Sequence, residues 1–589
     1  MKPVMVVAAG LARFDLRRYL VGALLWMPFS VLPLLGGVLL QQLFDRYAVS
    51  PQSALWLCVA FVGVEVVRGV SMVVAWTYGD WWWCAAATLL RTNVLRSVLT
   101  ARGPAATRLP GSSGEAVARL RDDAADAVEL VDEVVGLVGS ALFTTAALVI
   151  MATIDPVITV VLVVPMIVVG VLSRLMRRTI HRLHLRARVL GAATTAFVGE
   201  IFGAVLALKT AGAEEAALRR LRELNARRRD AAIKDRLATD LMDTATGATV
   251  EISIGLVLLL GAAAMRRGEF TVGDLALFTS YVSWLTALPR TVGAILYRLP
   301  QAAVATERLG RLMAAHENAH DLAARTPTFT PRKPIPPTIP ARGQTASGRL
   351  EVLEAWGLSV PGRLEGVSLR VERGSFTVIT GAVGAGKSTL VRALLGLQPV
   401  TAGTVAWNGE PVDDPGTFLV PGRVAYAGQV PRLFSETLRE NVLLGWPGTD
   451  AHVERALELA AFDLAEVEDA LDTVVGPRGV RLSGGQVQRA TAARALVRTP
   501  ELLVVDDLSS ALDVGTERLL WERIAADGPS TLLVVSHRRA VLDRADQIVV
   551  LYRGTVAGRG KPGDLLDTCP EMRRLWQEED QERGGSSCS

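Results

Sequence analysis

A chain of 589 residues is too long for one hydrophobic core, and with half of its residues apolar and 21% charged it is too apolar for a wholly soluble protein. The net charge is only +4, and the basic residues lie beside apolar runs, which argues against nucleic acid as a partner. The four cysteines, Cys58, Cys84, Cys569 and Cys588, lack paired or metal-ligand spacing, so neither a disulfide framework nor a zinc site is expected.

Six apolar segments in the first half of the chain are long enough to span a membrane, since a spanning helix needs about 20 mostly apolar residues. They are residues 19–43, 55–77, 134–154, 157–172, 245–265 and 275–294. The loops after the first, third and fifth segments are short, whereas residues 79–133 and 173–244 form long loops with a helical pattern. Arginines before the first segment and in the long loops predict that both termini and these loops lie in the cytoplasm.

Several features of this membrane half have more than one interpretation. Residues 109–124 and 199–215 each join a turn signal or an apolar patch to a charged helix, which suits either a docking element or ordinary packing of a helical hairpin. Glu65 and Arg68 lie three residues apart in the second segment, and a mutual ion pair is favoured over contact with a substrate. The run of three tryptophans at 81–83 is interpreted as an interfacial aromatic anchor.

A proline-rich stretch separates the membrane half from a soluble half. Prolines crowd residues 325–348 without hydrophobic periodicity, which predicts an extended tether. Beyond it, apolar strands such as 375–380 and 501–507 alternate with helical stretches, the pattern of a parallel α/β sheet. The predicted fold is therefore multidomain: an all-α six-helix transmembrane domain followed by an α/β domain, which the sequence "GAVGAGKS" at residues 381–388 indicates to be a nucleotide-binding domain of the phosphate-loop type. The predicted boundaries are residues 1–315 for the transmembrane domain, 316–348 for the linker and 349–589 for the soluble domain.

The sequence "GAVGAGKS" fits the phosphate-loop pattern, follows a predicted strand and leads into a predicted helix, the context that this motif requires. Glycines give the backbone the freedom to point successive N–H groups at phosphate oxygens, and the helix N-terminus adds partial positive charge. Lys387 supplies a charge to the β and γ phosphates, and Ser388 is expected to bind Mg²⁺. The predicted nucleotide-binding residues here are Gly381, Ala382, Val383, Gly384, Ala385, Gly386, Lys387, Ser388 and Thr389.

A second helix start suited to anions occurs in "RLSGGQVQRA", where a serine and two glycines precede a helical stretch. Its residues are Leu482, Ser483, Gly484, Gly485 and Gln486. One chain therefore carries one phosphate loop but two helix starts that favour phosphate. The simplest explanation is that the second serves the nucleotide of a partner chain.

These motifs resemble those of ATP-binding cassette (ABC) transporters. LSGGQ between the phosphate loop and a strand that ends in Asp506 is similar to the signature of this family, and six spans before one cassette look like a half-transporter of the exporter fold. The resemblance covers about residues 16–575. It implies a dimer in which two cassettes enclose two ATP molecules, each between the phosphate loop of one chain and the signature of the other. It also implies that the two patches in the long loops are coupling helices.

The resemblance assigns roles to further residues, each at the position of a family motif. Gln429 in "YAGQVPRLF" matches the glutamine that joins the Mg²⁺ and water network, and His537 in "VVSHR" matches the histidine that contacts the γ-phosphate. Asp506 matches the carboxylate that holds Mg²⁺, which gives Ser388, Gln429 and Asp506 as the metal-side residues. Asp513 in "SALD" matches the loop that crosses to the other cassette.

The sequence departs from the family pattern at three positions. Asp507 stands where most members carry the glutamate that polarises the attacking water, and it is one methylene shorter, which predicts a slower general base. Val360 occupies the place of the aromatic residue that stacks on adenine, and Trp356 is too far along the strand to replace it without a change of register. Pro477 replaces a common glutamate in the loop before the signature.

Two arrangements of the dimer follow from Asp507. In a heterodimer this chain would form a slow ATP-retaining site and its LSGGQ would complete a fast site on the partner; in a homodimer both sites would use Asp507. The heterodimer is favoured. The leading functional hypothesis is an ATP-driven exporter of a small molecule, peptide or lipid-like substrate in the inner (plasma) membrane, with the cassette in the cytoplasm. The alternatives are an importer of the exporter fold, as for siderophores, and a membrane ATP sensor that moves no substrate.

Overall fold

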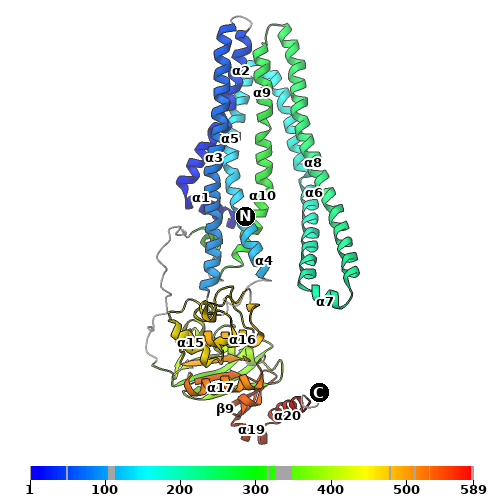
Figure 1. The fold of residues 1–589 in the computed structure, drawn as a ribbon. Coiled ribbons are helices and arrows are strands. Elements are labelled where there is room, and N and C mark those ends of the chain that lie inside the picture. The colour runs from blue at the N-terminus through cyan, green and yellow to red at the C-terminus, as the bar shows by residue number, and fades with distance from the viewer. Residues whose placement is uncertain are drawn as a thin grey trace. The chain divides into compact units, whose positions relative to one another are not determined.

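A computed structural model describes residues 2–47, 51–101, 103, 113–314, 317–324, 348–476, 479–508, 512–528 and 531–585. The chain divides into two compact units. The first contains Met1–Leu95 and Gly111–Pro327, and the second contains Arg96–Pro110 and Thr328–Ser589. All described strands lie in the second unit (Figure 1).

The first unit is built of long helices whose ends follow from local sequence. Asp155 begins the helix after the "IDP" turn, because its carboxylate accepts hydrogen bonds from the N–H groups of Val157 and Ile158 and Pro156 needs no partner there. The helices are α1 (Lys2–Phe14), α2 (Leu16–Tyr47), α3 (Pro51–Thr100), α4 (Ser113–Ala118), the π-helical turn η2 (Arg119–Asp123), α5 (Ala124–Ile154), α6 (Pro156–Gly203), α7 (Val205–Thr210), α8 (Glu214–Arg266), α9 (Val272–Leu285), α10 (Ala287–Gly310) and α11 (Ala319–Ala324).

Four of these helical stretches within the described residues are long and apolar enough to cross a membrane: Leu16–Tyr47, Ala54–Thr100, Ala116–Ile154 and Glu214–Arg266. They contain the first, second, third and fifth predicted spans. The fourth predicted span lies in α6, where the described residues include the apolar stretch Pro156–Pro165. The sixth is not one helix, because α9 ends at Leu285 and α10 begins at Ala287. Pro289 has no N–H to donate to the carbonyl of Leu285, which accounts for the interruption.

Helices α6 and α8 run side by side as a long pair, joined by the short α7 (Figure 1). The second predicted docking patch, residues 199–215, therefore forms the tip of this pair and contains α7. Much of the first patch, residues 104–112, lies outside the described residues. The predicted ion pair on α3 is confirmed: Arg68 Nε donates to Glu65 Oε2 over 2.9 Å.

Helix α11 lies within the residues assigned to the linker from the sequence, but it packs in the core of the first unit. Leu322 is fully buried, and its carbonyl accepts a hydrogen bond from Asn93 Nδ2 over 2.7 Å. The helix contacts α1. The first unit therefore extends further along the chain than residue 315, and residues 325–347 of the predicted linker lie outside the described residues.

The second unit contains two sheets. A four-stranded antiparallel sheet has the order β2-β1-β4-β5, and a six-stranded sheet has the order β10-β9-β3-β8-β7-β6, parallel except for β10. The strands are β1 (Val352–Val360), β2 (Leu364–Glu372), β3 (Phe376–Gly381), β4 (Ala402–Trp407), β5 (Glu410–Pro411), β6 (Val424–Ala427), β7 (Leu502–Asp506), β8 (Thr531–Val535), β9 (Gln547–Tyr552) and β10 (Thr555–Gly560). The parallel α/β pattern predicted from the alternation of strands and helices is present.

Helices cover this sheet and complete two hydrophobic cores around it. They are α12 (Lys387–Leu394), α13 (Pro415–Phe418), α14 (Leu438–Leu443), α15 (Asp450–Leu459), α16 (Gly484–Leu496), α17 (Val514–Asp527), α18 (Arg539–Leu542), α19 (Pro562–Thr568) and α20 (Pro570–Gly585), with 3₁₀ turns η3 (Leu464–Glu466) and η4 (Ala470–Asp472). Every residue of β3, β7 and β8 is buried. These three adjacent strands set the edge at which the candidate site residues emerge.

Candidate functional site

The phosphate loop links the buried strand β3 to helix α12. Gly386 is the N-cap of α12 with φ +104°, and a Cβ there would lie 2.8 Å from Leu364 Cδ2 and 2.9 Å from the carbonyl of Arg363. Gly381 at the end of β3 is equally restricted, since a Cβ would lie 2.3 Å from the carbonyl oxygen of Leu551. A side chain at either position would push the loop off the sheet. Between them Val383 is fully exposed at the tip of the loop.

Lys387 lies at the start of α12 and turns back over the loop. Its Nζ donates hydrogen bonds to the carbonyls of Gly381 (2.5 Å) and Ala382 (3.1 Å). Burial lowers the pKa of Lys387, and the negative charges of Asp507 and Asp506 act in the opposite direction. The ammonium group of Lys387 is thus bound to two backbone carbonyls, whose place phosphate oxygens could take. The carboxylates of Asp506 and Asp507 favour its charged form.

Asp506 ends strand β7 and is fully buried. Ser388 Oγ donates to its Oδ1 over 2.9 Å, and the Tyr426 hydroxyl donates to its Oδ2 over 3.2 Å. Tyr426 on β6 was not identified from the sequence. Burial, and after it the charge of Asp506, raise the pKa of its hydroxyl, so Tyr426 stays a neutral donor. Ser388 and Asp506 therefore meet at one point, as a shared role in binding Mg²⁺ requires.

The two oxygen ligands suit Mg²⁺, which binds proteins through one or two side chains together with phosphate oxygens and water. No cluster of three or more His, Cys, Asp or Glu side chains that could hold a metal by itself occurs in the part of the chain that the structure describes. The donor set thus fits an ion brought by a nucleotide. Gln429, the third predicted metal-side residue, follows β6 and is exposed.

Asp507 has a left-handed backbone, with φ +51°. Its N–H donates to the carbonyl of Val535 over 3.0 Å, which ties it to the neighbouring strand β8. Gln429 Nε2 lies 3.5 Å from Asp507 Oδ2, at the long limit for a hydrogen bond. His537 comes two residues after β8 and is exposed. The structure therefore brings Asp507 and Gln429 together at the edge where β6, β7 and β8 end.

Ser483 is the N-cap of helix α16 in the second anion-binding motif. Its Oγ accepts the N–H of Gln486 over 3.2 Å, and Gln486 Oε1 accepts the N–H of Ser483 over 2.8 Å, which forms a capping box. Glu466 on η3 holds this helix start from the side, through Gln486 Nε2 at 3.0 Å and Arg489 at 2.8 Å. Hydrogen bonding from Arg489 is the main cause of a lowered pKa for Glu466. Neither Glu466 nor Arg489 was singled out from the sequence, because no short motif contains both.

The remaining predicted residues lie as follows. Asp513 is the N-cap of α17, where its carboxylate accepts the N–H of Thr516 over 3.0 Å. Val360 at the end of β1 is 5% exposed and packs in the core, whereas Trp356 on the same strand is 55% exposed. The β1 pairing does shift register between these two residues. Pro477 lies outside the described residues.

Among the hydrogen bonds of the described residues, none joins the segment Leu482–Gln486 to the phosphate loop. The second unit also includes residues 96–110, where Gly103 is buried against the backbone of Gly416, so that a Cβ on Gly416 would lie 2.5 Å from Gly103 Cα. The chain thus carries the predicted phosphate loop, a second helix start at Ser483 that makes no described hydrogen bond to it, and a helical unit with apolar spans.

Comparison with known proteins agrees with this arrangement. The family of ABC transporter transmembrane regions matches residues 6–288, and the ABC transporter family matches residues 364–510. The chain is a half-transporter of the ABC exporter fold. It is a multi-pass membrane protein with an ATP-binding cassette.

Two curated relatives illustrate the range of similar transporters. A probable multidrug resistance ABC transporter ATP-binding/permease protein of Bacillus subtilis (strain 168) is 30% identical over 326 residues, which cover 54% of each chain. An ATP-dependent lipid A-core flippase of Chromobacterium violaceum is 26% identical over 542 residues, 90% of this half-transporter and 89% of the flippase. The match thus spans about half of the first relative and most of the second.

A solved structure shows the same fold. The structure of a bacterial Atm1-family ABC exporter with ATP bound aligns with a TM-score of 0.79 over 96% of this half-transporter and 98% of the exporter. The sequences are 22% identical, so this likeness concerns the fold.

Proposed function

We propose that this half-transporter is one subunit of a dimeric, ATP-driven exporter in the plasma membrane, with its cassette and both termini in the cytoplasm. The observation that carries the proposal is the pair of helix starts, α12 with Lys387 and α16 with Ser483, of which only the first belongs to a complete phosphate site. The second would cap the nucleotide of the partner subunit. Because Ser483 Oγ accepts the N–H of Gln486, its hydroxyl hydrogen can still be donated to a phosphate oxygen.

Within this proposal each site residue has a defined task. Lys387 exchanges the carbonyls of Gly381 and Ala382 for phosphate oxygens, and Ser388 and Asp506 hold Mg²⁺ with the nucleotide. The ion, when bound, neutralises charge on the β and γ phosphates. Asp507 accepts the proton of the attacking water, and His537 and Gln429 orient the γ-phosphate and that water.

We also propose that this chain forms the slow site of a heterodimer. The aspartate carboxylate is shorter than that of glutamate, so it could reach the attacking water only if its backbone moved toward the water. The backbone is held in place, because the Asp507 N–H is bound to Val535 on β8, which lies between β3 and β7 in the sheet. The neighbouring Gln429 is already at the limit of hydrogen-bond distance. A misplacement of about 1 Å can lower a rate by about a hundredfold. A partner with glutamate at this position would supply the fast site.

ATP turnover of the purified chain alone tests this second proposal. We expect slow turnover, a rise of about tenfold to a hundredfold in Asp507→Glu, and loss of activity in Asp507→Asn. Asp564→Glu, an exposed aspartate on α19, is the matched control and should change nothing. Brisk turnover of the wild-type chain that Asp507→Glu does not increase would contradict a degenerate site.

The dimer itself is tested by cross-linking. Ser483→Cys and Val383→Cys, combined in one chain, are expected to give a covalent dimer when ATP is trapped and to give little without nucleotide, while each single variant shows the background from the native cysteines. A nucleotide-trapped protein that stays monomeric would overturn the shared ATP sites. The direction of transport is tested separately in membrane vesicles. An exporter is expected to move substrate into inverted vesicles but not into right-side-out vesicles, and an importer is expected to give the reverse result. If the transmembrane helices show no nucleotide-dependent movement, the chain is a sensor.

A further inference from the structure

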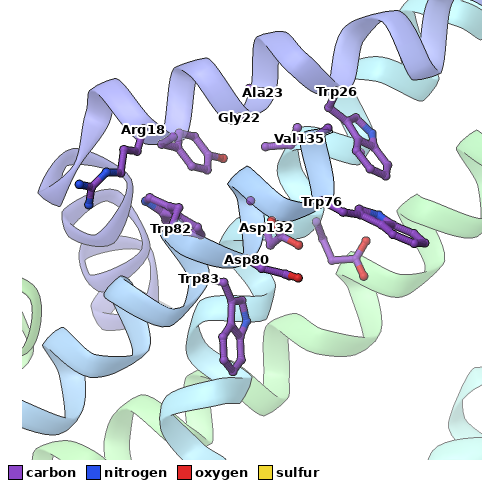
Figure 2. A pocket seen from close by; sticks show the side chains of 15 residues that line it. Arg18, Gly22, Ala23, Trp26, Trp76, Asp80, Trp82, Trp83, Asp132 and Val135 are labelled. Carbon is purple, nitrogen blue, oxygen red and sulfur yellow. The ribbon is translucent and has the colours of Figure 1, made fainter. Parts of the chain in front are cut away.

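A small cavity opens in the first unit where helices α2, α3 and α5 meet (Figure 2). Its volume is about 190 Å³. Its lining comes from the cytoplasmic ends of the first three predicted spans, at Tyr19, at Trp76 and at Val135. This volume lies below the about 300 Å³ at which drug-sized pockets begin. The cavity therefore suits a compact chemical group at the level where the helices leave the bilayer.

The walls of the cavity are aromatic. Figure 2 shows the indoles of Trp26, Trp76, Trp82 and Trp83 arranged around it. Trp82 is 2% exposed and its ring lies 4.9 Å from that of Tyr19, whose hydroxyl donates to the carbonyl of Val131 over 3.1 Å. The rings on this side are therefore fixed by packing.

The run of three tryptophans does not act as a single anchor. Trp81 is 66% exposed and lies outside the cavity lining, whereas its two neighbours Trp82 and Trp83 belong to it. Of these three tryptophans, only Trp81 is exposed as an interfacial anchor would be while lying outside the cavity lining.

The cavity also carries excess negative charge. Asp80 and Asp132 are exposed into it, and their carboxylates lie close enough to interact with each other (Figure 2). Neither carboxylate forms an ion pair with another residue that the structure describes. The two charged neighbours are already engaged: Glu133 pairs with Arg298 at 3.2 Å, and Arg18 pairs with Asp15 at 3.1 Å.

We propose that this cavity binds a compact organic ammonium group. Indole faces attract cations, most strongly when water is excluded, and two adjacent carboxylates favour a positive charge between them. An anion is disfavoured by the same carboxylates. An alkylammonium group satisfies both the apolar walls and the charge, whether it belongs to a free small cation or to the headgroup of a lipid. The inference concerns binding alone and does not depend on the direction of transport or on the pairing of subunits.

Choline and its neutral isostere 3,3-dimethylbutan-1-ol provide the decisive comparison, because they differ in charge and hardly in shape. Binding of radiolabelled choline to the purified half-transporter in dodecyl maltoside is measured by scintillation proximity. We expect saturable binding that unlabelled choline and tetraethylammonium displace, and that the isostere at the same concentration does not. Equal displacement by the isostere, or no saturable binding, would overturn the proposal.

Substitutions in the cavity wall test its location. Asp132→Asn is expected to weaken choline binding about tenfold or more, because the electrostatic attraction between the carboxylate and the quaternary ammonium is lost. Trp83→Leu is expected to weaken it by about 2- to 30-fold, the range of a cation–π contact. Trp83→Phe, which keeps an aromatic face, should retain most of the affinity.

Two control variants separate this effect from general damage. Trp81→Leu removes the exposed neighbour in the same run, and Glu251→Gln removes an exposed carboxylate of α8 outside the cavity. Both should bind choline within about twofold of wild type at an unchanged melting temperature. If the controls lose as much affinity as Asp132→Asn and Trp83→Leu, the binding does not occur in this cavity.

The source of the ammonium group is decided in nanodiscs. Discs of phosphatidylglycerol alone are compared with discs that also contain phosphatidylcholine. Suppressed choline binding in the second kind identifies a lipid headgroup as the occupant, and unchanged binding identifies a free cation; both outcomes support an ammonium site.

Discussion

The cassette and the transmembrane unit place their apolar side chains in opposite ways. In the cassette every residue of β3, β7 and β8 is buried within the same chain. On α3 of the transmembrane unit, Val62, Val66 and Val70 are each 59% exposed. An apolar surface of this kind needs lipid or another protein to cover it. The cassette is thus stabilised chiefly by its own packing, whereas the transmembrane unit relies on its surroundings.

The largest test of this contrast compares two leucines. Leu533 on β8 is fully buried, and Leu533→Ala is expected to lower the free energy of unfolding by about 2–5 kcal/mol through the cavity that it leaves. Leu259 on α8 is 71% exposed, and Leu259→Ala should stay within about 0.5 kcal/mol in detergent. Chemical unfolding of both variants gives the two values. Equal losses of unfolding free energy in the two variants would contradict the proposed difference between the cassette and the transmembrane unit.

A second test asks whether the cassette of a single chain binds ATP through its own phosphate loop. Lys387→Ala should weaken ATP binding by about 10- to 150-fold, because a charge-assisted contact to phosphate is lost. Lys561→Ala at the exposed N-cap of α19 is the matched control. Titration with a fluorescent ATP analogue measures both affinities, and an unchanged affinity in Lys387→Ala would exclude the phosphate-loop role.

The cap of α16 is expected to have a smaller effect on stability. Ser483→Ala removes the acceptor for the Gln486 N–H and should destabilise the cassette by about 1 kcal/mol. Ser483→Thr keeps a hydroxyl and should lose less. If thermal unfolding shows no difference between the two variants, the capping box does not stabilise the helix start.

The smallest expected effect is a pH dependence at Glu466. Hydrogen bonding to Arg489 lowers its pKa in the folded state, so its contribution to stability is present above its ordinary value of 4.5 and is lost as the pH falls through the lowered pKa. Between about pH 5 and about pH 3 the melting temperature of wild type should therefore fall slightly more than that of Glu466→Gln. Parallel curves would show that this pair, of an exposed Glu466 and a buried Arg489, contributes nothing measurable.

The difference between the two units also explains what the sequence could predict. The phosphate loop, Asp506 and Ser483 were found because their chemistry needs certain residue types at fixed spacing. Tyr426 and Glu466 were missed, because each meets its partner only after distant segments have folded together. In the membrane half, hydropathy located the four helices that are long and apolar enough to cross a membrane, but it did not show the break between α9 and α10 in the sixth predicted span. It also could not show that Leu322 continues the core beyond residue 315 or that Trp82 lines a cavity.

The left-handed backbone of Asp507 has a consequence for how such a site can change. Aspartate adopts this conformation more readily than most residues, because its short polar side chain can bond locally. Replacement by glutamate therefore extends the carboxylate toward the water but places a less suitable residue in a left-handed conformation. Because this costs stability, a faster Asp507→Glu enzyme should melt at a lower temperature. The short aspartate side chain at position 507 would then be the common cause of the proposed slow hydrolysis and of a less strained backbone.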